Sequence, residues 1–280
     1  MLNKILKISF IVVIVGIVMA TVGVVVVGQN FEEIMDWYNR DEEYAAVEQA
    51  TDELFTKITI EAVNRKVIIS PTTESEIKIN YYESDKDFFI YTEKDGEISL
   101  KNKVLSPYVW IFPTWVSPEI NTITIELPDT FVGELKLIST NGNIEIRNIS
   151  SLEQVSMTTT NGSVVVKNIN IIANIFAAST NGLITFEDNV IEGNLYASTT
   201  NGTITLKNND CDAISVSTSN GNVNITHPGL KDDYKIDVRT TNGKITLDGL
   251  KISSQVLNIN KTSSIKARTT NGSISIDFTN

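Results

Sequence analysis

The stretch LISTNGNIEIR at residues 137–147 decides the fold, because its pattern recurs seven times in the second half of this 280-residue chain. Each copy joins two short alternating apolar runs through a Ser or Thr, one further residue and an Asn-Gly pair. The pairs are Asn141-Gly142, Asn161-Gly162, Asn181-Gly182, Asn201-Gly202, Asn220-Gly221, Asn242-Gly243 and Asn271-Gly272. Their spacings are 20, 20, 20, 19, 22 and 29 residues. A period near twenty is typical of an architecture in which each repeat packs on the next.

Apolar residues recur at four fixed offsets from each asparagine: six and four residues before it, and three and five residues after it. In the first copy these residues are Leu135, Leu137, Ile144 and Ile146. Alternation with a period of two predicts two strands per repeat, each with one buried face.

Two architectures accommodate these strand pairs. If Asn-Gly is a type I′ hairpin turn, the repeats form an antiparallel hairpin barrel or sandwich. If Asn-Gly is a corner of a coil, successive coils stack as parallel strands about 4.8 Å apart. The near-constant period favours the coil, since stacking places asparagine over asparagine and allows hydrogen bonds between them. We therefore predict an all-β protein, a β-solenoid resembling a right-handed parallel β-helix, with the hairpin fold as the alternative. A positive φ at the corner glycines predicts that Gly202→Val destabilises the domain.

Residues 55–134 show less regular alternation, for example at Ile58, Ile60 and Ala62, and are expected to form early rungs of the same domain. Asp95-Gly96 and the alternating run after it are interpreted as a degenerate copy of the repeat. The predicted β-strand-repeat domain therefore covers residues 55–280.

The runs ITIELP at 123–128 and LKLISTNGNIEIRNI at 135–149 resemble a bacterial putative-adhesin family of unknown function. This is the β-strand-repeat type found in LiaG-like, membrane-anchored envelope proteins, and the resemblance covers residues 55–280. It implies an extracytoplasmic β-helical domain associated with the cell envelope and its stress response. The family carries no established active site, so the resemblance assigns no functional residue.

The N-terminus predicts a membrane anchor. Residues 8–27 are 20 consecutive uncharged residues, about 30 Å of helix, which is enough to cross a bilayer. Lys4 and Lys7 precede this run and acidic residues follow it, which predicts a cytoplasmic N-terminus and an extracytoplasmic remainder. A cleaved signal peptide is the competing interpretation, but the run is long and has no Ala-x-Ala site. We predict a single-pass anchor at residues 1–29, in contact with the membrane through residues 5–27.

An acidic segment follows the anchor. Residues 30–56 hold nine acids and one base, a charge of −8 within a chain whose net charge is −11. Phe31, Ile34, Met35 and Tyr38 have helical spacing, so residues 30–54 are predicted to form a juxtamembrane helical stalk. Basic residues are not clustered, which argues against nucleic acid as a partner.

Catalytic chemistry has few candidates. His227 is the only histidine, and its place in the repeat predicts a residue of the second corner of the coil. Cys211 lies between Asp210 and Asp212 in another such corner and is not predicted to be a nucleophile. The two aspartates could hold a hard cation such as Ca²⁺, but they are interpreted as solvated turn residues. The outward column six residues after each asparagine mixes charges: Arg147, Lys167, Glu187, Lys207, Thr226, Asp248 and Asp277. No catalytic residue, cofactor or metal site is therefore predicted.

An aromatic segment outside the regular repeat is the best candidate for a partner surface or for a cap over the end of the solenoid. It contains Tyr108, Trp110, Phe112 and Trp115. The predicted function is a non-catalytic, extracytoplasmic binding or scaffolding module of adhesin-like type, whose partner is an envelope glycan or a membrane protein. The alternatives are a glycan-acting β-helix enzyme and an accessory subunit of an envelope-stress sensing system.

Overall fold

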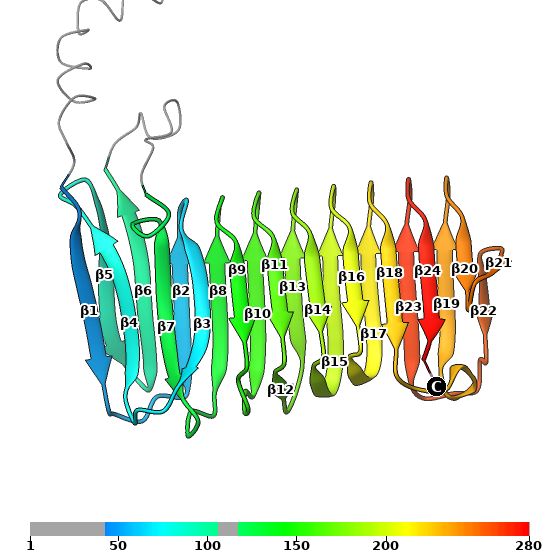
Figure 1. Ribbon diagram of the computed structural model, residues 1–280, viewed down its shortest axis with the longest axis horizontal. Helices are drawn as coiled ribbons and strands as arrows, with labels where there is room; N and C mark the ends of the chain where they lie inside the picture. The colour runs from blue at the N-terminus through cyan, green and yellow to red at the C-terminus, as the bar shows by residue number, and fades with distance from the viewer. Residues whose placement is uncertain (1–42, 106–116, 280) are drawn as a thin grey trace, which may run out of the picture. The chain divides into compact units, whose positions relative to one another are not determined.

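The computed structural model of the protein describes residues 43–105 and 117–279 (Figure 1). The predicted membrane anchor, residues 30–42 of the predicted stalk and the aromatic segment at 108–115 lie outside the described residues. Within the described part, no helix has the length and apolar character needed to cross a bilayer.

The described residues form one β-unit, in which two sheets of twelve strands pack face to face. Sheet A contains, in spatial order, β1 (Ala45–Thr51), β4 (Ile77–Glu83), β7 (Thr122–Pro128), β3 (Lys66–Thr72), β9 (Ile144–Arg147), β11 (Val164–Lys167), β14 (Ile184–Glu187), β16 (Ile204–Lys207), β18 (Val223–His227), β24 (Ile274–Phe278), β20 (Ile245–Leu247) and β21 (Leu250–Ile252). Sheet B contains β22 (Gln255–Leu257), β19 (Lys235–Thr240), β23 (Ser264–Thr269), β17 (Asp210–Thr218), β15 (Val190–Thr199), β13 (Ile175–Ser179), β10 (Gln154–Thr159), β8 (Glu134–Ser139), β2 (Lys57–Ala62), β6 (Glu97–Val104) and β5 (Asp87–Lys94), with β12 (Asn170–Ile171) paired to β15. A 3₁₀ turn, η1 (Lys231–Asp233), precedes β19.

The repeats stack in parallel and in register, which confirms the solenoid and excludes the hairpin barrel or sandwich. In sheet B, Leu135 pairs with Val155, Val155 with Ile175, and Ile175 with Leu195. In sheet A, β9, β11, β14, β16 and β18 pair in the same parallel manner. Each repeat therefore forms one rung, with one strand in each sheet (Figure 1).

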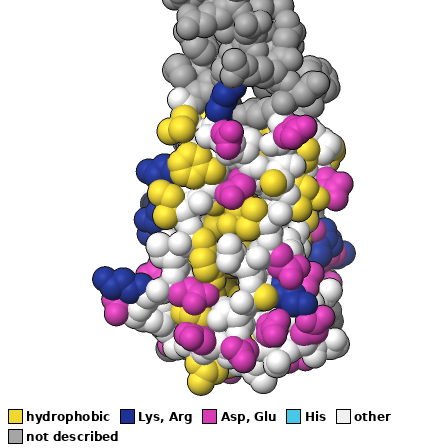
Figure 2. Space-filling model, turned by 90° about the vertical axis from the view of Figure 1, so that its left-hand side faces the viewer, with side chains coloured by type: hydrophobic (Ala, Val, Ile, Leu, Met, Phe, Trp, Pro, Cys, Tyr) yellow, Lys and Arg dark blue, Asp and Glu magenta, His cyan; other side chains and the backbone are white. Residues whose placement is uncertain are grey.

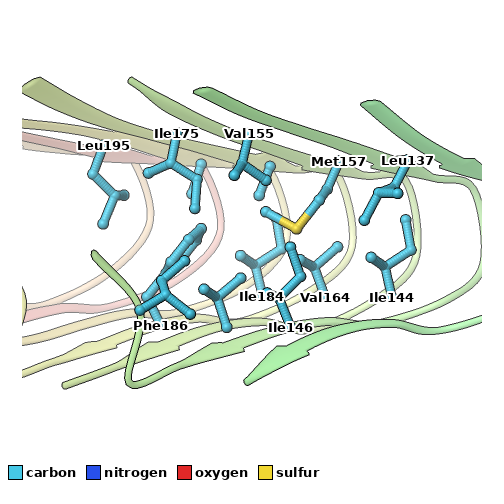
Figure 3. Close-up of a cluster of buried hydrophobic side chains, with 14 of the residues drawn as sticks. Leu137, Ile144, Ile146, Val155, Met157, Val164, Ile175, Ile184, Phe186 and Leu195 are labelled. Carbon is cyan, nitrogen blue, oxygen red and sulfur yellow. The ribbon is translucent and has the colours of Figure 1, made fainter. Parts of the chain in front are cut away.

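The core lies between the sheets and consists of the four apolar columns that the spacing predicted. Leu137, Met157, Ile146 and Phe186 project into this interior from opposite sheets (Figure 3). All four are buried, together with the equivalent residues of the other rungs. Burial of apolar surface along the whole stack, at about 25 cal/mol per Å², is the main term that stabilises the unit.

The Asn-Gly pairs form a polar column along one corner. Each asparagine donates a side-chain hydrogen bond to the asparagine of the adjacent rung, as Asn181 does to Asn161 at 2.6 Å and Asn201 to Asn181 at 2.7 Å. The hydroxyl group two residues earlier bonds to a glycine carbonyl of the adjacent rung, as Thr199 does to Gly182 at 3.1 Å. The threonines therefore bond across rungs to backbone, not to one another.

The corner glycines are required by close packing between rungs and not by a positive φ, which corrects the reason given for Gly202→Val. Positive φ values among the described glycines occur only at Gly96 and Gly249. At Gly202, a Cβ atom would lie 1.8 Å from the Gly182 carbonyl oxygen, far inside van der Waals contact. A column of residues with positive φ lies instead at the opposite corner, where Asn148, Asn168, Asp188 and Asn208 stack.

Antiparallel strands cap both ends of the stack. β1 pairs with β4 and β5 with β6 at one end, and β21 and β22 pair with β20 and β19 at the other. The interpretation of Asp95-Gly96 as a degenerate copy of the repeat was therefore wrong. These two residues form the turn of the β5–β6 hairpin. Asp95 has a φ of 53° and Gly96 a φ of 75°, which are the values that a type I′ turn requires.

The described part of the predicted helical stalk, residues 43–54, contains the strand β1. The prediction of a helix was wrong for Ala45–Thr51, because this segment pairs along its whole length with β4. Val47 packs partly buried against the core, and Glu48 and Ala50 point outward. The backbone hydrogen bonds to β4 override the local helical preference of this alanine-rich sequence.

The last rung in the sequence is not the last rung in space. β23 and β24 insert between the rung of β17 and β18 and the rung of β19 and β20. Asn271 accordingly bonds to Asn220 at 2.7 Å and receives a bond from Asn242 at 2.8 Å. The 29-residue interval in the repeat spacing reflects the hairpin and loops that cap the end before the chain turns back.

Candidate functional site

The outward face of sheet A carries a series of ion pairs between side chains of neighbouring strands. The carboxylate of Glu187 accepts hydrogen bonds from Lys167 and Lys207, the latter at 2.6 Å. These bonds lower the pKa of Glu187 to about 2. Glu145 pairs in the same way with Lys66, at 3.1 Å, and with Arg147. The described side chains named here are ion-paired at the surface of sheet A.

The outward face of sheet B differs, because two aromatic side chains stack on it. Phe176 of β13 and Tyr196 of β15 occupy equivalent positions in adjacent rungs and pair in register. Their ring centroids lie 4.8 Å apart and the ring planes are inclined by only 4°. Although stacked, the rings are 37% and 38% exposed. Such a pair is a rigid apolar feature on the outward face of sheet B.

Small side chains surround this aromatic pair and leave a shallow hollow of about 310 Å³. Ser156 and Ser215 occupy the equivalent positions in the rungs on either side, so the outer faces of both rings have only small neighbours. The parallel column two residues further along the strands also lines the hollow and consists of Thr158, Ala178, Ser198 and Ser217. Over four rungs this face, which we call the aromatic–hydroxyl face, contains no charged side chain.

Charges border the aromatic–hydroxyl face without entering it. Lys136 lies in the same column one rung before Ser156, and Lys266 one rung after Ser215. Arg268, beside Lys266, is paired with Asp237 at 3.1 Å. Along the side of sheet B nearest the second corner lie the exposed acids Glu153, Glu192 and Asp212. The hollow is therefore a neutral area within a surface of mixed charge.

A second hollow, of about 620 Å³, lies at the β1 end of the unit between β1, β4 and β7. Figure 2 views the unit from this end, where hydrophobic side chains lie among acidic and basic ones. Tyr82 donates a hydrogen bond to Glu119 at 3.0 Å on the wall of this hollow. Pro118, beside Glu119, also lines this hollow.

His227 is a core residue and not the corner residue that the repeat alignment predicted. It ends β18 and pairs in register with Phe278, and its side chain is only 1% exposed. Its Nδ1 atom accepts a hydrogen bond from the backbone N–H of Gly229 at 2.9 Å. The rings of Tyr234 and Phe278 pack against it, and burial lowers the pKa of the imidazole. A buried neutral imidazole of this kind contributes to packing at the end of the parallel stack.

Cys211 is also buried, within β17, where burial and the neighbouring Asp210 and Asp212 raise the pKa of its thiol to about 12. A thiol with that pKa is protonated at neutral pH and is a poor nucleophile. The cysteine therefore behaves as a small apolar core residue.

Of the sequence-predicted site residues, the aromatic segment of Tyr108, Trp110, Phe112 and Trp115 lies outside the described residues. The predicted turn residues are brought together as the corner column described above. Phe176 and Tyr196 were missed, although the repeat contains the signal. Five residues before each asparagine the outward column reads Lys136, Ser156, Phe176, Tyr196, Ser215, Asp237 and Lys266. Two adjacent aromatics in an outward column would have identified the face.

The chain belongs to the Toastrack DUF4097 family, which matches residues 55–178 and 170–280. The match confirms the family resemblance predicted from the repeat. No curated protein matches the chain.

Similar solved structures include three proteins of low sequence identity. A putative cell adhesion protein from Clostridium sporogenes is 16% identical with a TM-score of 0.38, and the match covers 84% of this chain and 100% of that one. A putative adhesin from Parabacteroides distasonis is 9% identical with a TM-score of 0.45, over 85% and 98% of the two chains. A putative lipid binding protein from the same organism is 11% identical with a TM-score of 0.37, over 86% and 98%.

Proposed function

We propose that this protein is a non-catalytic, membrane-anchored binding module that holds a stiff β-solenoid outside the cell and contacts an envelope component through the aromatic–hydroxyl face. The observation that carries the proposal is the stacked pair of Phe176 and Tyr196, exposed at the centre of an uncharged hollow. Exposed aromatic side chains in a shallow hollow with convergent hydroxyl groups are the usual chemistry of a binding surface.

The state of the candidate catalytic groups supports a binding role over an enzymatic one. A carboxylate that serves as a general acid needs a raised pKa, whereas lysines hold that of Glu187 low. The only histidine and the only cysteine are buried in the core, and burial raises the pKa of the Cys211 thiol to about 12, away from the nucleophilic thiolate. The repeated corner column, with its continuous bonding between rungs, suits a rigid scaffold.

The proposed extracytoplasmic placement of the domain is tested with a cysteine introduced beside the exposed Asn-Gly corner. In Thr180→Cys the new thiol is accessible, whereas the native Cys211 is buried and serves as an internal control. A membrane-impermeant maleimide added to intact cells should label Thr180→Cys and leave the parent protein unlabelled. Labelling that requires cell lysis would contradict the extracytoplasmic placement.

Binding is tested by sedimenting the full-length protein, in detergent, with purified envelope fragments. The double variant Phe176→Ala/Tyr196→Ala should lose co-sedimentation. Its matched control is Thr185→Ala/Thr205→Ala, which changes outward residues of adjacent rungs on sheet A. Equal loss in both double variants, or no loss in the first, would refute the assignment of the binding face.

A further inference from the structure

We infer that the aromatic–hydroxyl face binds an uncharged glycan strand. This inference rests on the proposed function and specifies the chemical class of its ligand. The face combines apolar ring surface with hydroxyl groups, and a sugar ring presents the matching combination of C–H surface and hydroxyl groups.

Apolar contact comes from the two rings. Because Ser156 and Ser215 flank the stack, the outer face of each ring is accessible to a flat, partly apolar group such as the C–H face of a pyranose. Aromatic rings supply a large contact area with little loss of conformational entropy, and here the stacking already fixes both rings. The binding surface is therefore preorganised.

Polar contact comes from the hydroxyl groups around the rings. A Ser or Thr hydroxyl both donates and accepts, as a sugar hydroxyl does, so the two can bond in either direction. Ser156, Thr158, Ser198, Ser215 and Ser217 lie on three of four adjacent rungs, and the four rungs span three strand spacings, or about 14 Å. This length fits a short run of a linear glycan, and the regular rung spacing suits a ligand that is itself a repeating polymer.

The charge distribution selects an uncharged ligand. A charged group placed over the centre of the face would lose hydration without gaining a partner, which is costly. The acids Glu153, Glu192 and Asp212 along one side would also repel an acidic polymer. Lys136 and Lys266 lie outside the hollow, five strand spacings or about 24 Å apart. Neither lysine is placed to neutralise a charge at the rings.

The experiment measures co-sedimentation of the full-length protein, in detergent, with envelope fragments treated in four ways before mixing. One sample is digested with protease, one is extracted with solvent to remove lipid, one has its carboxylates neutralised by amidation, and one is oxidised with periodate, which cleaves the vicinal diols of sugars. Binding should survive the first three treatments and be lost after periodate. It should also be unchanged between 50 mM and 500 mM salt, because no ion pair forms.

The variants complete the test. Phe176→Ala/Tyr196→Ala should weaken binding to untreated fragments by about tenfold or more. Lys136→Glu/Lys266→Glu should leave it within about twofold, because the lysines lie outside the hollow. Binding that depends on Phe176 and Tyr196 but is lost after protease, solvent or amidation, or falls with salt, would overturn the uncharged-glycan assignment and leave the proposed function intact. Absence of any binding to untreated fragments would overturn both.

Discussion

Substitution of a single corner glycine should destabilise the stack far more than its small size suggests. In Gly202→Ala the added Cβ would lie 1.8 Å from the Gly182 carbonyl oxygen and 2.7 Å from its carbon. Since real Cβ contacts are almost never shorter than 3.0 Å, the two rungs must separate locally by about 1.2 Å, the difference between 3.0 and 1.8. That movement weakens the bonds from Thr199 to Gly182 and from Asn201 to Asn181.

The size of the effect follows from these contacts. Overpacking in a well-packed interior costs about 1–3 kcal/mol, and two weakened hydrogen bonds add about 1 kcal/mol each. The total is roughly 3–5 kcal/mol, and for a domain of this size each kcal/mol lowers the melting temperature by about 2–4 °C. Thermal unfolding of the full-length variant, followed by circular dichroism, should therefore show a decrease of roughly 6–20 °C.

A matched pair of controls separates steric clash from backbone conformation. Gly249 has a φ of +73° and open space around its Cβ position. Gly249→Ala should cost about 1–2 kcal/mol, and Gly249→Asn less, because asparagine tolerates positive φ. At position 202 asparagine should be no better than alanine. A melting temperature for Gly202→Ala within 2 °C of the parent protein, or rescue by Gly202→Asn, would refute the reasoning.

Three further predictions concern the asparagine column and the decrease of stability at acidic pH. Asn181→Ala removes bonds to both Asn161 and Asn201, and should lower the free energy of unfolding in urea by about 1–2 kcal/mol; an unchanged urea midpoint would mean that the asparagine column is not stabilising. Burial lowers the pKa of His227 in the folded state, so the unfolded chain takes up a proton first as the pH falls through about 6.5. Stability should therefore decrease below that pH and level off below the folded pKa. His227→Phe should abolish the dependence in this window, and a dependence that persists in this variant would contradict the assignment to His227. Lysines lower the pKa of Glu187 from 4.5 to about 2, so its contribution is present above pH 4.5 and is lost as the pH falls towards 2. Glu187→Gln should reduce the pH dependence of the free energy of unfolding in that lower window alone. An equal pH dependence in the variant and the parent protein would exclude a stabilising role for the ion pairs of Glu187.

The sequence determined the central part of the fold well, because the repeat contains both of the periodicities that the solenoid needs. Alternation identified the inward residues, such as Leu137 and Ile146, and the twenty-residue period identified the stacking. Asn64-Arg65 is an eighth corner of the same column, since Asn141 bonds to Asn64 and Ser139 to the Arg65 carbonyl. It was missed because it lacks glycine. Arg65 begins the column, so its side chain can turn into the end of the unit, where it pairs with Asp87 at 2.6 Å.

The ends were predicted less well, because their structure depends on long-range pairing that has no local signature. The same Xaa-Gly turn chemistry serves as a corner at Asn201-Gly202 and as a hairpin at Asp248-Gly249, and only the neighbouring rung distinguishes the two. The strand at β1 is set by its pairing with β4. The insertion of β23 and β24 ahead of β19 and β20 reverses chain order, which a periodic pattern does not encode.

The most direct test of the in-register stack is a disulfide cross-link between rungs. Asn224 of β18 pairs with Ser275 of β24, and Ser275 pairs with Thr246 of β20, so Asn224 and Thr246 lie two spacings apart. Adjacent parallel strands, about 4.8 Å apart, fall within the Cα separation that a disulfide spans. Oxidation followed by mass spectrometry should cross-link Asn224→Cys/Ser275→Cys and leave Asn224→Cys/Thr246→Cys reduced. A cross-link in the second pair and none in the first would mean that the rungs stack in chain order, and no cross-link in either would contradict the parallel register itself.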